Sequence, residues 1–387
     1  MALPISYNVR NVRVRWQVTL LAIFGIALVV AVFIVLSAMS SGFRLALRAT
    51  GRSDNAMVVQ KGSTSELVSG IPREQASVIM VDPRIARGAD GQPLASPEIM
   101  VVVSLPRKVD GTEINVTLRG VTPRAFDVRG GIKIVEGRNF NPGLYEIIVG
   151  QRAYDRFGLQ VGKAVKLQKK DWEVVGVFSS EGSGFESEIW GDLDATGPAF
   201  LRTGGYQSIA VRLADPGALP ALKDTLENDP QMQVSVIQER KYYEDQAGFI
   251  AGALMGLAIL VSLVMGVGAV FGAMNTMYAI VSARTREIGT LRALGFSRRS
   301  ILFSFVTEAV FLALIGGVLG CVFALPADGI TSATNGANFS ELAFAFRITA
   351  PTLVAGLVFA LVMGFLGGLL PAWRGARLPI TSALREA

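Results

Sequence analysis

The stretch that decides the fold is residues 284–299, which read RTREIGTLRALGFSRR. This basic segment carries five arginines and one glutamate, and it lies between two long runs without charged residues. Lys and Arg concentrate in the cytoplasmic loops of membrane proteins, so the basic segment is predicted to be cytoplasmic. Ile288, Leu291 and Leu294 recur at every third position, which predicts that they share one face of a short helix. A helix of this kind offers a surface to a soluble partner.

Four stretches of the chain contain no Asp, Glu, Lys or Arg. They are residues 16–43, 246–283, 309–327 and 348–373. A helix needs roughly 20 apolar residues to cross a bilayer, so each stretch predicts a transmembrane helix. The chain of 387 residues is 51% hydrophobic with a mean hydropathy of +0.44, which is too apolar for an ordinary soluble enzyme. The first stretch exceeds the apolar core of a secretory signal and no small-x-small site follows it, so we expect an uncleaved anchor.

Positive charge is concentrated in three places along the chain. Residues 1–15, 284–299 and 374–387 carry net charges of +3, +4 and +2, whereas the whole chain carries +6. Both termini and the basic segment are therefore predicted to be cytoplasmic, with membrane lipid as a neighbour. No basic stripe with interleaved aromatic residues occurs, so no nucleic-acid partner is expected.

Composition also argues against catalysis in this chain. It has no histidine, and its one cysteine, Cys321, lies within an apolar stretch. The commonest general base and metal ligand are thus missing, and no intrachain disulfide can form. Gly158–Ala164 lacks the spacing and the hydroxyl of a phosphate-binding loop. We expect no catalytic, cofactor-binding or metal site, and we interpret the acids of residues 181–194 as a solvated loop rather than a calcium site.

The predicted fold class is a membrane protein with four transmembrane α-helices and a large extracytoplasmic α+β domain between helices 1 and 2. The predicted segments are a cytoplasmic N-terminus (1–15), the first span (16–43), the α+β domain (44–245), a long second span (246–283), a cytoplasmic coupling helix and turn (284–299), the third span (300–327), an external loop (328–347), the fourth span (348–373) and a cytoplasmic C-terminus (374–387).

Within residues 44–245 the pattern predicts both strands and helices. Strands are expected at 56–60, 99–104, 113–119, 146–149 and 208–213, and a hairpin at 163–168 and 172–178. Helices are expected at 73–80, 151–157 and 217–228. In the external loop we expect a helix around Ser340–Phe346.

The second uncharged stretch is longer than a bilayer requires. Its 38 residues would extend about 57 Å as a helix, so the helix should project from the membrane, tilt or kink. The alternative is a break near Gly266 or Gly268. An unbroken helix would transmit motion across the membrane to the α+β domain.

Glycines are spaced for close helix packing. The second span carries Gly248, Gly252, Gly256, Gly268 and Gly272. Small residues four apart let helix backbones approach, which favours self-association on this face. The alternative is packing against the chain's own spans. The glycines at 316, 317, 320, 364, 367 and 368 are interpreted as internal packing.

Two local features bear on the basic segment. Gly295 can end its helix in the left-handed conformation, and Ser297 can cap the next helix. The segment would then have a fixed orientation, although its arginines could instead only anchor to anionic lipid. Glu308, within the third span, is expected to form a structural hydrogen bond or pair with an arginine rather than belong to a proton relay.

The residues from Thr285 to Gly295, followed by Glu308-Ala309 and by 315–317, resemble the FtsX-like permease domain of ABC transporters. The ending 370–380 is similar to the closing pattern of the same MacB/LolC-LolE/FtsX superfamily, and residues 8–43, 136–140 and 174–177 resemble the MacB-like arrangement. The resemblance implies a homodimer, or a pair with a related permease, in which each subunit binds a cytoplasmic ABC ATPase. It also implies that ATP and Mg are held by that separate subunit, because no ATPase is fused here.

The resemblance assigns residues 284–295 as the coupling helix. The candidate contacts with the ATPase are Arg284, Arg286, Glu287, Ile288, Gly289, Leu291, Arg292, Ala293, Leu294 and Gly295. The implied function is that of a permease subunit in the bacterial inner membrane that moves its external domain to export or extract a lipid, lipoprotein, drug or peptide. A periplasmic adaptor or chaperone would be a further partner. The alternatives are an FtsX-like transducer that activates an external partner without transport, and a receptor without any ATPase.

Overall fold

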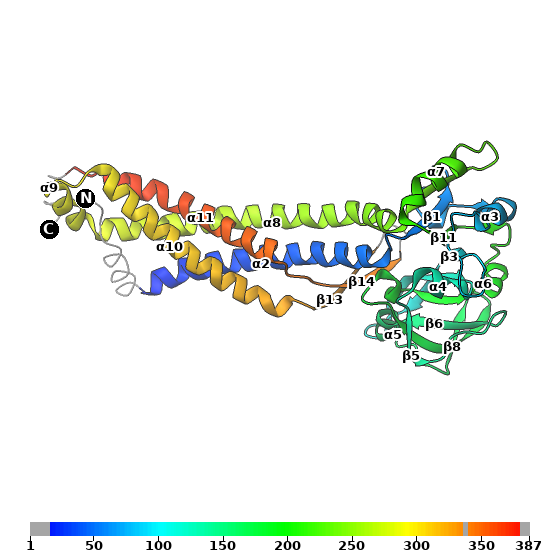
Figure 1. The fold of residues 1–387 in the computed structure, drawn as a ribbon. Coiled ribbons are helices and arrows are strands. Elements are labelled where there is room, and N and C mark those ends of the chain that lie inside the picture. The colour runs from blue at the N-terminus through cyan, green and yellow to red at the C-terminus, as the bar shows by residue number, and fades with distance from the viewer. Residues whose placement is uncertain (1–15, 336–339, 380–387) are drawn as a thin grey trace. The chain divides into compact units, whose positions relative to one another are not determined.

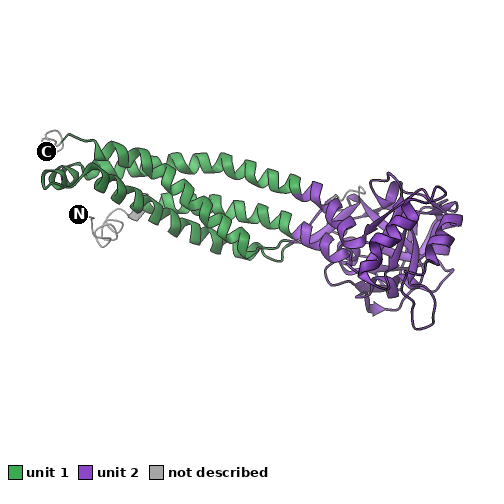
Figure 2. Ribbon diagram, turned by 45° about the horizontal axis from the view of Figure 1, so that its top comes forward, with its two compact units in different colours: residues 1–41, 252–330, 346–387 green, residues 42–251, 331–345 purple. Residues whose placement is uncertain are grey.

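The computed structural model describes residues 16–335 and 340–379. The described residues divide into two compact units (Figure 2). The helical unit draws on residues 1–41, 252–330 and 346–387, and the α+β unit on residues 42–251 and 331–345. The predicted cytoplasmic residues 1–15 and 380–387 lie outside the described residues.

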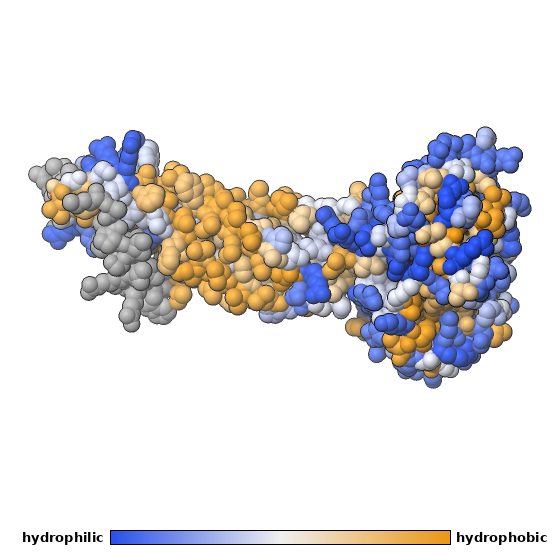
Figure 3. Space-filling view, in the orientation of Figure 1, coloured by the Kyte–Doolittle hydropathy of each residue, from blue (hydrophilic) through white to orange (hydrophobic). Residues whose placement is uncertain are grey.

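Four helices of the described chain are long and apolar enough to cross a membrane. They are α2 (Trp16–Thr50), α8 (Glu239–Ala283), α10 (Arg298–Ala324) and α11 (Ala350–Ala376) (Figure 1). Hydrophobic residues cover much of the middle stretch of the long helices, whereas the end near α9 is largely hydrophilic (Figure 3). Helix α8 continues for 45 residues without interruption, so the alternative of a break near Gly266 or Gly268 is wrong. The short helix α9 (Thr285–Ala293) follows α8.

Glycines bring α2, α10 and α11 into close contact. A Cβ placed at Gly320 of α10 would lie 2.7 Å from the Ala27 carbonyl oxygen of α2. A Cβ at Gly317 would lie 2.8 Å from the Ala360 Cβ of α11. Distances of this size leave no space for a side chain, so the prediction of internal packing for the glycines of α10 and α11 is confirmed.

One sheet of ten strands forms the centre of the α+β unit, in the order β12-β1-β11-β3-β4-β9-β6-β8-β5, with β7 paired to β8. The strands are β1 (Asn55–Gln60), β3 (Ala95–Pro106), β4 (Glu113–Val121), β5 (Lys133–Gly137), β6 (Glu146–Gly150), β7 (Ala164–Leu167), β8 (Lys170–Ser179), β9 (Ile189–Asp192), β11 (Ser208–Arg212) and β12 (Val234–Gln238). A separate pair joins β2 (Ile71–Pro72) to β10 (Gly205–Tyr206).

The long strand β3 links the two halves of this sheet. Its residues up to Glu98 pair with β11, and from Ile99 onward they pair with β4. The pairings β4–β9 and β6–β8 are parallel, and the other pairings of the sheet are antiparallel. We call the Glu98–Ile99 position of β3 the sheet seam.

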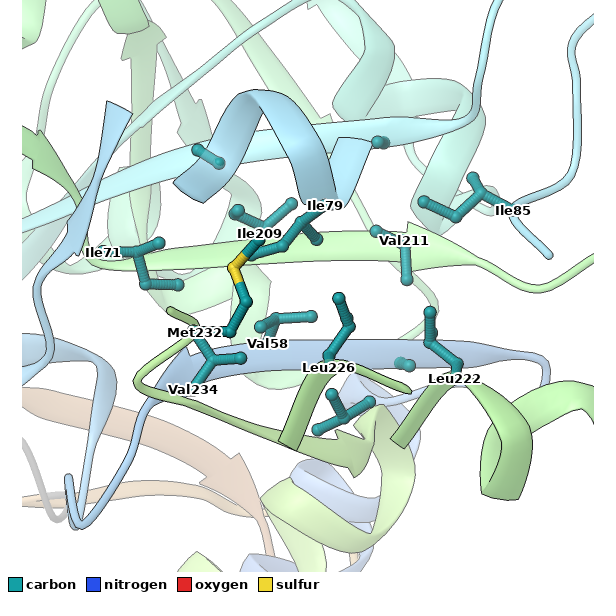
Figure 4. Packing of buried hydrophobic residues seen from close by; sticks show 14 of the residues in the cluster. Val58, Ile71, Ile79, Ile85, Ile209, Val211, Leu222, Leu226, Met232 and Val234 are labelled. Atoms are coloured by element: carbon teal, nitrogen blue, oxygen red, sulfur yellow. The ribbon is translucent and has the colours of Figure 1, made fainter. Parts of the chain in front are cut away.

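Helices cover the sheet. They are α3 (Arg73–Met80), α4 (Arg124–Arg129), α5 (Gln151–Phe157), α6 (Leu193–Ala199) and α7 (Leu219–Glu227), with 3₁₀ turns η1 (Glu66–Val68), η2 (Gly184–Ser187) and η3 (Pro216–Ala218). Near β1, Leu222 and Leu226 of α7 and Ile79 of α3 pack on Val58 and Val211 (Figure 4). The α+β class follows from this layering of helices on a mixed sheet.

The segment between α10 and α11 differs from expectation. A helix was predicted around Ser340–Phe346, but the structure has the strand β14 (Glu341–Ala345), paired antiparallel with β13 (Thr331–Asn335). Arg156 of α5 donates from Nε to Glu341 Oε2 at 2.7 Å, and Ala343 N donates to Ser187 Oγ at 3.0 Å. The contacts with α5 and η2 join residues 185 and 156 positions apart in the chain, so they could not be read from the local pattern.

The acidic residues between 181 and 194 are a second correction. They were interpreted as a solvated loop, which holds for the exposed Glu181 and Asp194, but Glu186 is 6% exposed and Asp192 is 3% exposed. Asp192 begins helix α6, where its Oδ2 accepts from Ala195 N at 3.2 Å. Glu188 accepts from Arg119. Each of these three carboxylates has a structural partner, which explains its position away from solvent.

Candidate functional site

The basic segment folds into a helix with a defined end. Helix α9 ends in a Schellman motif, in which Phe296 N donates to Leu291 O at 3.1 Å and Gly295 N donates to Arg292 O at 3.2 Å. Gly295 has a φ of +95°, a conformation that glycine adopts without steric cost. Ser297 Oγ then accepts from Ser300 N at 3.2 Å at the start of α10. The predicted roles of Gly295 and Ser297 are confirmed.

Two arginines attach α9 to the neighbouring helices. Arg284 Nη1 donates to Glu308 Oε2 of α10 at 2.9 Å, and both side chains are buried. The Arg284 guanidinium also lies 5.6 Å from the centre of the Phe305 ring. Arg292 Nη1 donates to the Ala376 carbonyl oxygen at the end of α11, at 2.9 Å. The expectation that Glu308 pairs with an arginine is confirmed.

Apolar contacts complete this attachment. Ile288 is 2% exposed and packs in a cluster with Val281, Ile301 and Phe305. A Cβ at Gly375 of α11 would lie 2.8 Å from Val281 Cγ1, so α11 approaches the end of α8 closely. Helix α9 is thus held by α8, α10 and α11, and it has a fixed orientation within the helical unit.

The ten candidate contact residues divide by exposure. Arg284, Ile288 and Gly289 are buried and Leu291 and Arg292 are partly buried, whereas Arg286, Glu287, Ala293, Leu294 and Gly295 are exposed. Leu294 was predicted to share a helical face with Ile288, but it lies past the last residue of α9 and is 73% exposed. The buried members hold α9 in place, so the surface that a partner can reach consists of the exposed members.

The glycines of α8 present a different surface. A Cβ at Gly248, Gly252, Gly256, Gly268 or Gly272 would meet nothing within 4 Å among the described residues. The alternative of packing against the chain's own spans therefore does not hold for these positions. Gly266 does contact α11, because its Cβ would lie 2.9 Å from Phe359 Cζ.

Sequence reasoning missed a set of charged residues in the α+β unit, of which five are buried and Glu188 is partly buried. Its members are Glu66, Glu98, Arg119, Arg129, Glu188 and Glu239. One signal was available: Glu98 directly precedes the apolar run 99–103 of β3, and Arg119 follows Leu118 on β4. Within the described part of the chain, no group of three or more His, Cys, Asp or Glu side chains is placed to hold a metal ion.

Comparison with known families gives two matches along the chain. Residues 19–229 match the family described as MacB-like periplasmic core domain. Residues 259–380 match the family described as FtsX-like permease C-terminal. The second match contains α9 and its contacts on α10 and α11.

Similar proteins include membrane permeases from several bacteria. An uncharacterized ABC transporter permease of Bacillus subtilis strain 168, YvrN, is 27% identical, with 94% of this chain and 93% of that protein aligned. The macrolide export ATP-binding/permease protein MacB of Neisseria gonorrhoeae is 26% identical over 71% of this chain, which spans only 44% of the length of MacB.

Among solved structures, the periplasmic region of MacB from Actinobacillus actinomycetemcomitans aligns with a TM-score of 0.39 at 15% identity, over 51% of this chain and 94% of that region. The family matches cover both the α+β unit and the helices with α9. The chain therefore belongs to the family with a MacB-like periplasmic core domain, and it is a multi-pass ABC transporter permease of the MacB/FtsX type.

Proposed function

We propose that this permease couples ATP binding and hydrolysis by a separate ABC ATPase to movement of its α+β unit. The observation that carries the proposal is the attachment of α9 by Arg284–Glu308 and by Arg292–Ala376 O. A helix held on two neighbours passes a force applied to it on to α10 and α11. A loosely tethered basic loop would absorb the same force.

The side of the membrane follows from charge. Five arginines in the basic segment favour a cytoplasmic position for it. The span α8 lies between the basic segment and the α+β unit along the chain, so the α+β unit would then lie outside the cytoplasm. A bacterial inner membrane is the corresponding location. ATP and Mg would be bound by the partner ATPase, and the exposed residues Arg286 and Leu294 would contact it.

The work done outside the membrane is proposed to be export. The relative MacB is named for macrolide export, so an amphiphilic drug is the first substrate to test, ahead of lipids, lipoproteins and peptides. A periplasmic adaptor or chaperone would receive the substrate. A second copy of the permease, or a related permease, would pack on the glycine face of α8.

The proposal is tested by co-purification with the ABC ATPase co-expressed from the same organism. Arg286→Glu combined with Leu294→Asp changes two exposed residues without disturbing the attachment of α9. We expect at least a ten-fold loss of ATPase capture, about 1.4 kcal/mol. Lys166→Glu, which reverses one positive charge as Arg286→Glu does but at an exposed residue of the α+β unit, is the control and should bind normally. Undiminished capture by the double variant would overturn the assignment of this surface.

A further inference from the structure

Six charged residues of the α+β unit, five of them buried, form one connected cluster, which we call the ionic joint. Its members are Glu66 (η1), Glu98 (β3), Arg119 (β4), Arg129 (α4), Glu188 (before β9) and Glu239 (α8). Two features require explanation: the depth at which these charges are buried, and their connection to the first residue of the long helix α8.

Arg119 is the centre of one half of the joint. Its Nη1 donates to Glu66 Oε1 at 2.7 Å and to Glu98 Oε2 at 2.8 Å, and its Nε donates to Glu188 Oε2 at 2.8 Å. Its side chain is fully buried. Through Glu98, which lies at the sheet seam, Arg119 of β4 connects to the strand that joins both halves of the sheet.

Arg129 is the centre of the other half and reaches α8. Its Nη2 donates to Glu98 Oε2 at 2.6 Å, and its Nη1 donates to Glu239 Oε1 at 2.5 Å. The second oxygen of Glu239 accepts from Asn55 Nδ2 of β1 at 2.9 Å and from Arg52 N at 3.1 Å. The first residue of α8 is therefore bonded to α4, to β1 and to the segment that follows α2.

The end of α2 lies against the same place. Thr50 Oγ1, in the last turn of α2, accepts from Gly184 N at 2.7 Å. The next residue, Phe185, has its ring centre 4.4 Å from the Arg129 guanidinium and 5.6 Å from that of Arg119. Phe185 also packs edge-to-face on Tyr243 of α8. Both long helices that enter the α+β unit thus meet the ionic joint.

Stability alone does not account for such an arrangement. Burying charged groups carries a desolvation cost that their mutual attraction often only balances, and apolar replacements of similar volume are frequently as stable. Charge pairs with fixed hydrogen-bond geometry do provide one thing that apolar contacts do not, which is a defined direction for each partner. The joint also contains two arginines and four glutamates, so each arginine is shared among several carboxylates.

Glu66 and Arg119 favour each other's charged forms. Burial alone would raise the pKa of Glu66, but the nearby Arg119 outweighs it and lowers that pKa below its usual value. Burial likewise opposes the charge of Arg119, yet Glu188 and Glu66 raise its pKa well above the usual value. The directions of these two pKa shifts favour the ion pair between Arg119 and Glu66, which the geometry shows at 2.7 Å.

We propose that the ionic joint couples α8 to the sheet seam. A displacement of α8 would then turn both halves of the sheet instead of bending the chain where the first turn of α8 leaves the sheet. Arg129 and Glu239 are then positioning residues for the coupling, since they touch neither an ATPase nor a substrate. The inference rests on the proposed function for its purpose, but the stiffness of the connection can be measured without any ATPase.

The test uses full-length protein in nanodiscs with two spin labels. Cys321→Ser provides a cysteine-free background, and labels are attached at Leu260→Cys, 61% exposed on α8, and at Lys166→Cys, exposed on β7. The readout is the distribution of distances between the two labels by double electron–electron resonance, first without the ATPase.

Glu239→Gln keeps the shape of the side chain and removes its charge. We expect the distance distribution to become roughly twice as wide, because the amide has one acceptor oxygen and cannot accept both from Arg129 and from Asn55, so the first turn of α8 is held more weakly. Glu244→Gln is the matched control: the same change on the same helix, at a glutamate whose pair with Arg48 is exposed. It should leave the distribution unchanged. An equal width for Glu239→Gln and the parent protein would overturn the proposal.

A second measurement separates positioning from general stability. If Glu239→Gln lowers the melting temperature until the α+β unit unfolds, Arg129→Lys takes its place, since lysine keeps the charge but lacks the planar fork by which Arg129 bonds Glu98 and Glu239 from different nitrogens. A folded Arg129→Lys protein must show a broader distance distribution than the parent protein. An unchanged width would overturn the proposed coupling role of the ionic joint.

Addition of the ATPase and a non-hydrolysable ATP analogue then tests the proposed function independently. A shift of the mean distance in the parent protein supports nucleotide-driven movement, and no shift contradicts it. The width measured without the ATPase reports on the joint alone, so failure of one idea is distinguishable from failure of the other.

Discussion

The glycines of α8 and those of α10 and α11 have similar spacings in similarly apolar helices, yet they occupy opposite environments. In the most apolar window of α8, 17% of the residues are buried, against 39% in α10 and 33% in α11. On α10 and α11 the glycines face the backbone of a neighbouring helix, whereas on α8 most of them face open space. The spacing of glycines therefore identifies a helix face that permits close approach of another helix. Which helix packs there depends on what surrounds that face.

The largest expected effect is at the packed face. Gly368→Leu of α11 would place a side chain where its Cβ already overlaps the Ala309 Cβ of α10. Neither backbone can move without separating the helices, so we expect a loss of about 3 kcal/mol or more of stability. The measurement is the yield and melting temperature of monodisperse protein in detergent. Gly272→Leu on α8, where nothing lies within 4 Å, is the control. Equal losses in both variants would remove the distinction between the two faces.

The next effect concerns association. Gly252→Leu with Gly256→Leu should leave the folded monomer intact, because a side chain at either position meets open space. We expect self-association to weaken about ten-fold or more, since the bulky side chains keep a second α8 from approaching. Energy transfer between labelled copies in liposomes measures the equilibrium. If the double variant associates as the parent does, a lipid-facing role replaces the proposed dimer face.

Sequence revealed those features that local chemistry determines. Arg73–Met80 and Gln151–Phe157 were predicted with the bounds that α3 and α5 have, because apolar periodicity and flanking residues define such helices. The hairpin of β7 and β8 was also confirmed. The Schellman end of α9 followed from Gly295 for the same reason, since the left-handed conformation favours glycine.

Features that depend on distant partners were missed or misread. Helix α6 was missed for a local reason instead: it contains Gly197 and Pro198, which are poor helix formers, although Asp192 caps its start. Glu188 looked solvated because its partner Arg119 is 69 residues away along the chain. For α9, the sequence indicated a helix with candidate contacts. It did not show that Arg284 and Ile288 hold the helix in place, because their partners belong to α10 and α11.

Gly295, which ends α9, has a conformational role, and its replacement should have a smaller effect on stability than the changes above. Gly295 has a φ of +95° and no neighbour within 4 Å, so its role is conformational. Gly295→Ala should cost about 1 kcal/mol, because a Cβ is unfavourable in the left-handed region. The expected result is fraying of the end of α9, seen as faster amide hydrogen exchange at residues 291–296, together with weaker ATPase capture. Gly295→Asn should behave nearly as the parent, since Asn tolerates this conformation better than Ala. Unchanged exchange for Gly295→Ala would show that the end of α9 adapts without glycine.

The smallest effect is expected at Gly266, the glycine of α8 that does contact α11. A Cβ there would lie 2.9 Å from Phe359 Cζ, the far end of a side chain that can rotate away. Alanine is also the better helix former by up to about 1 kcal/mol, so Gly266→Ala should change the melting temperature little, in either direction. Gly367→Ala is the matched variant on the facing side of the same interface, where the added Cβ would lie 2.9 Å from Ala273 Cβ and 3.3 Å from the Val270 carbonyl oxygen. Those atoms belong to the α8 backbone or are fixed to it, so this variant should destabilise the protein clearly more than Gly266→Ala. A reversed order of the two melting temperatures would mean that Phe359 is held more firmly than the α8 backbone, and that α8 belongs to the packed set of helices.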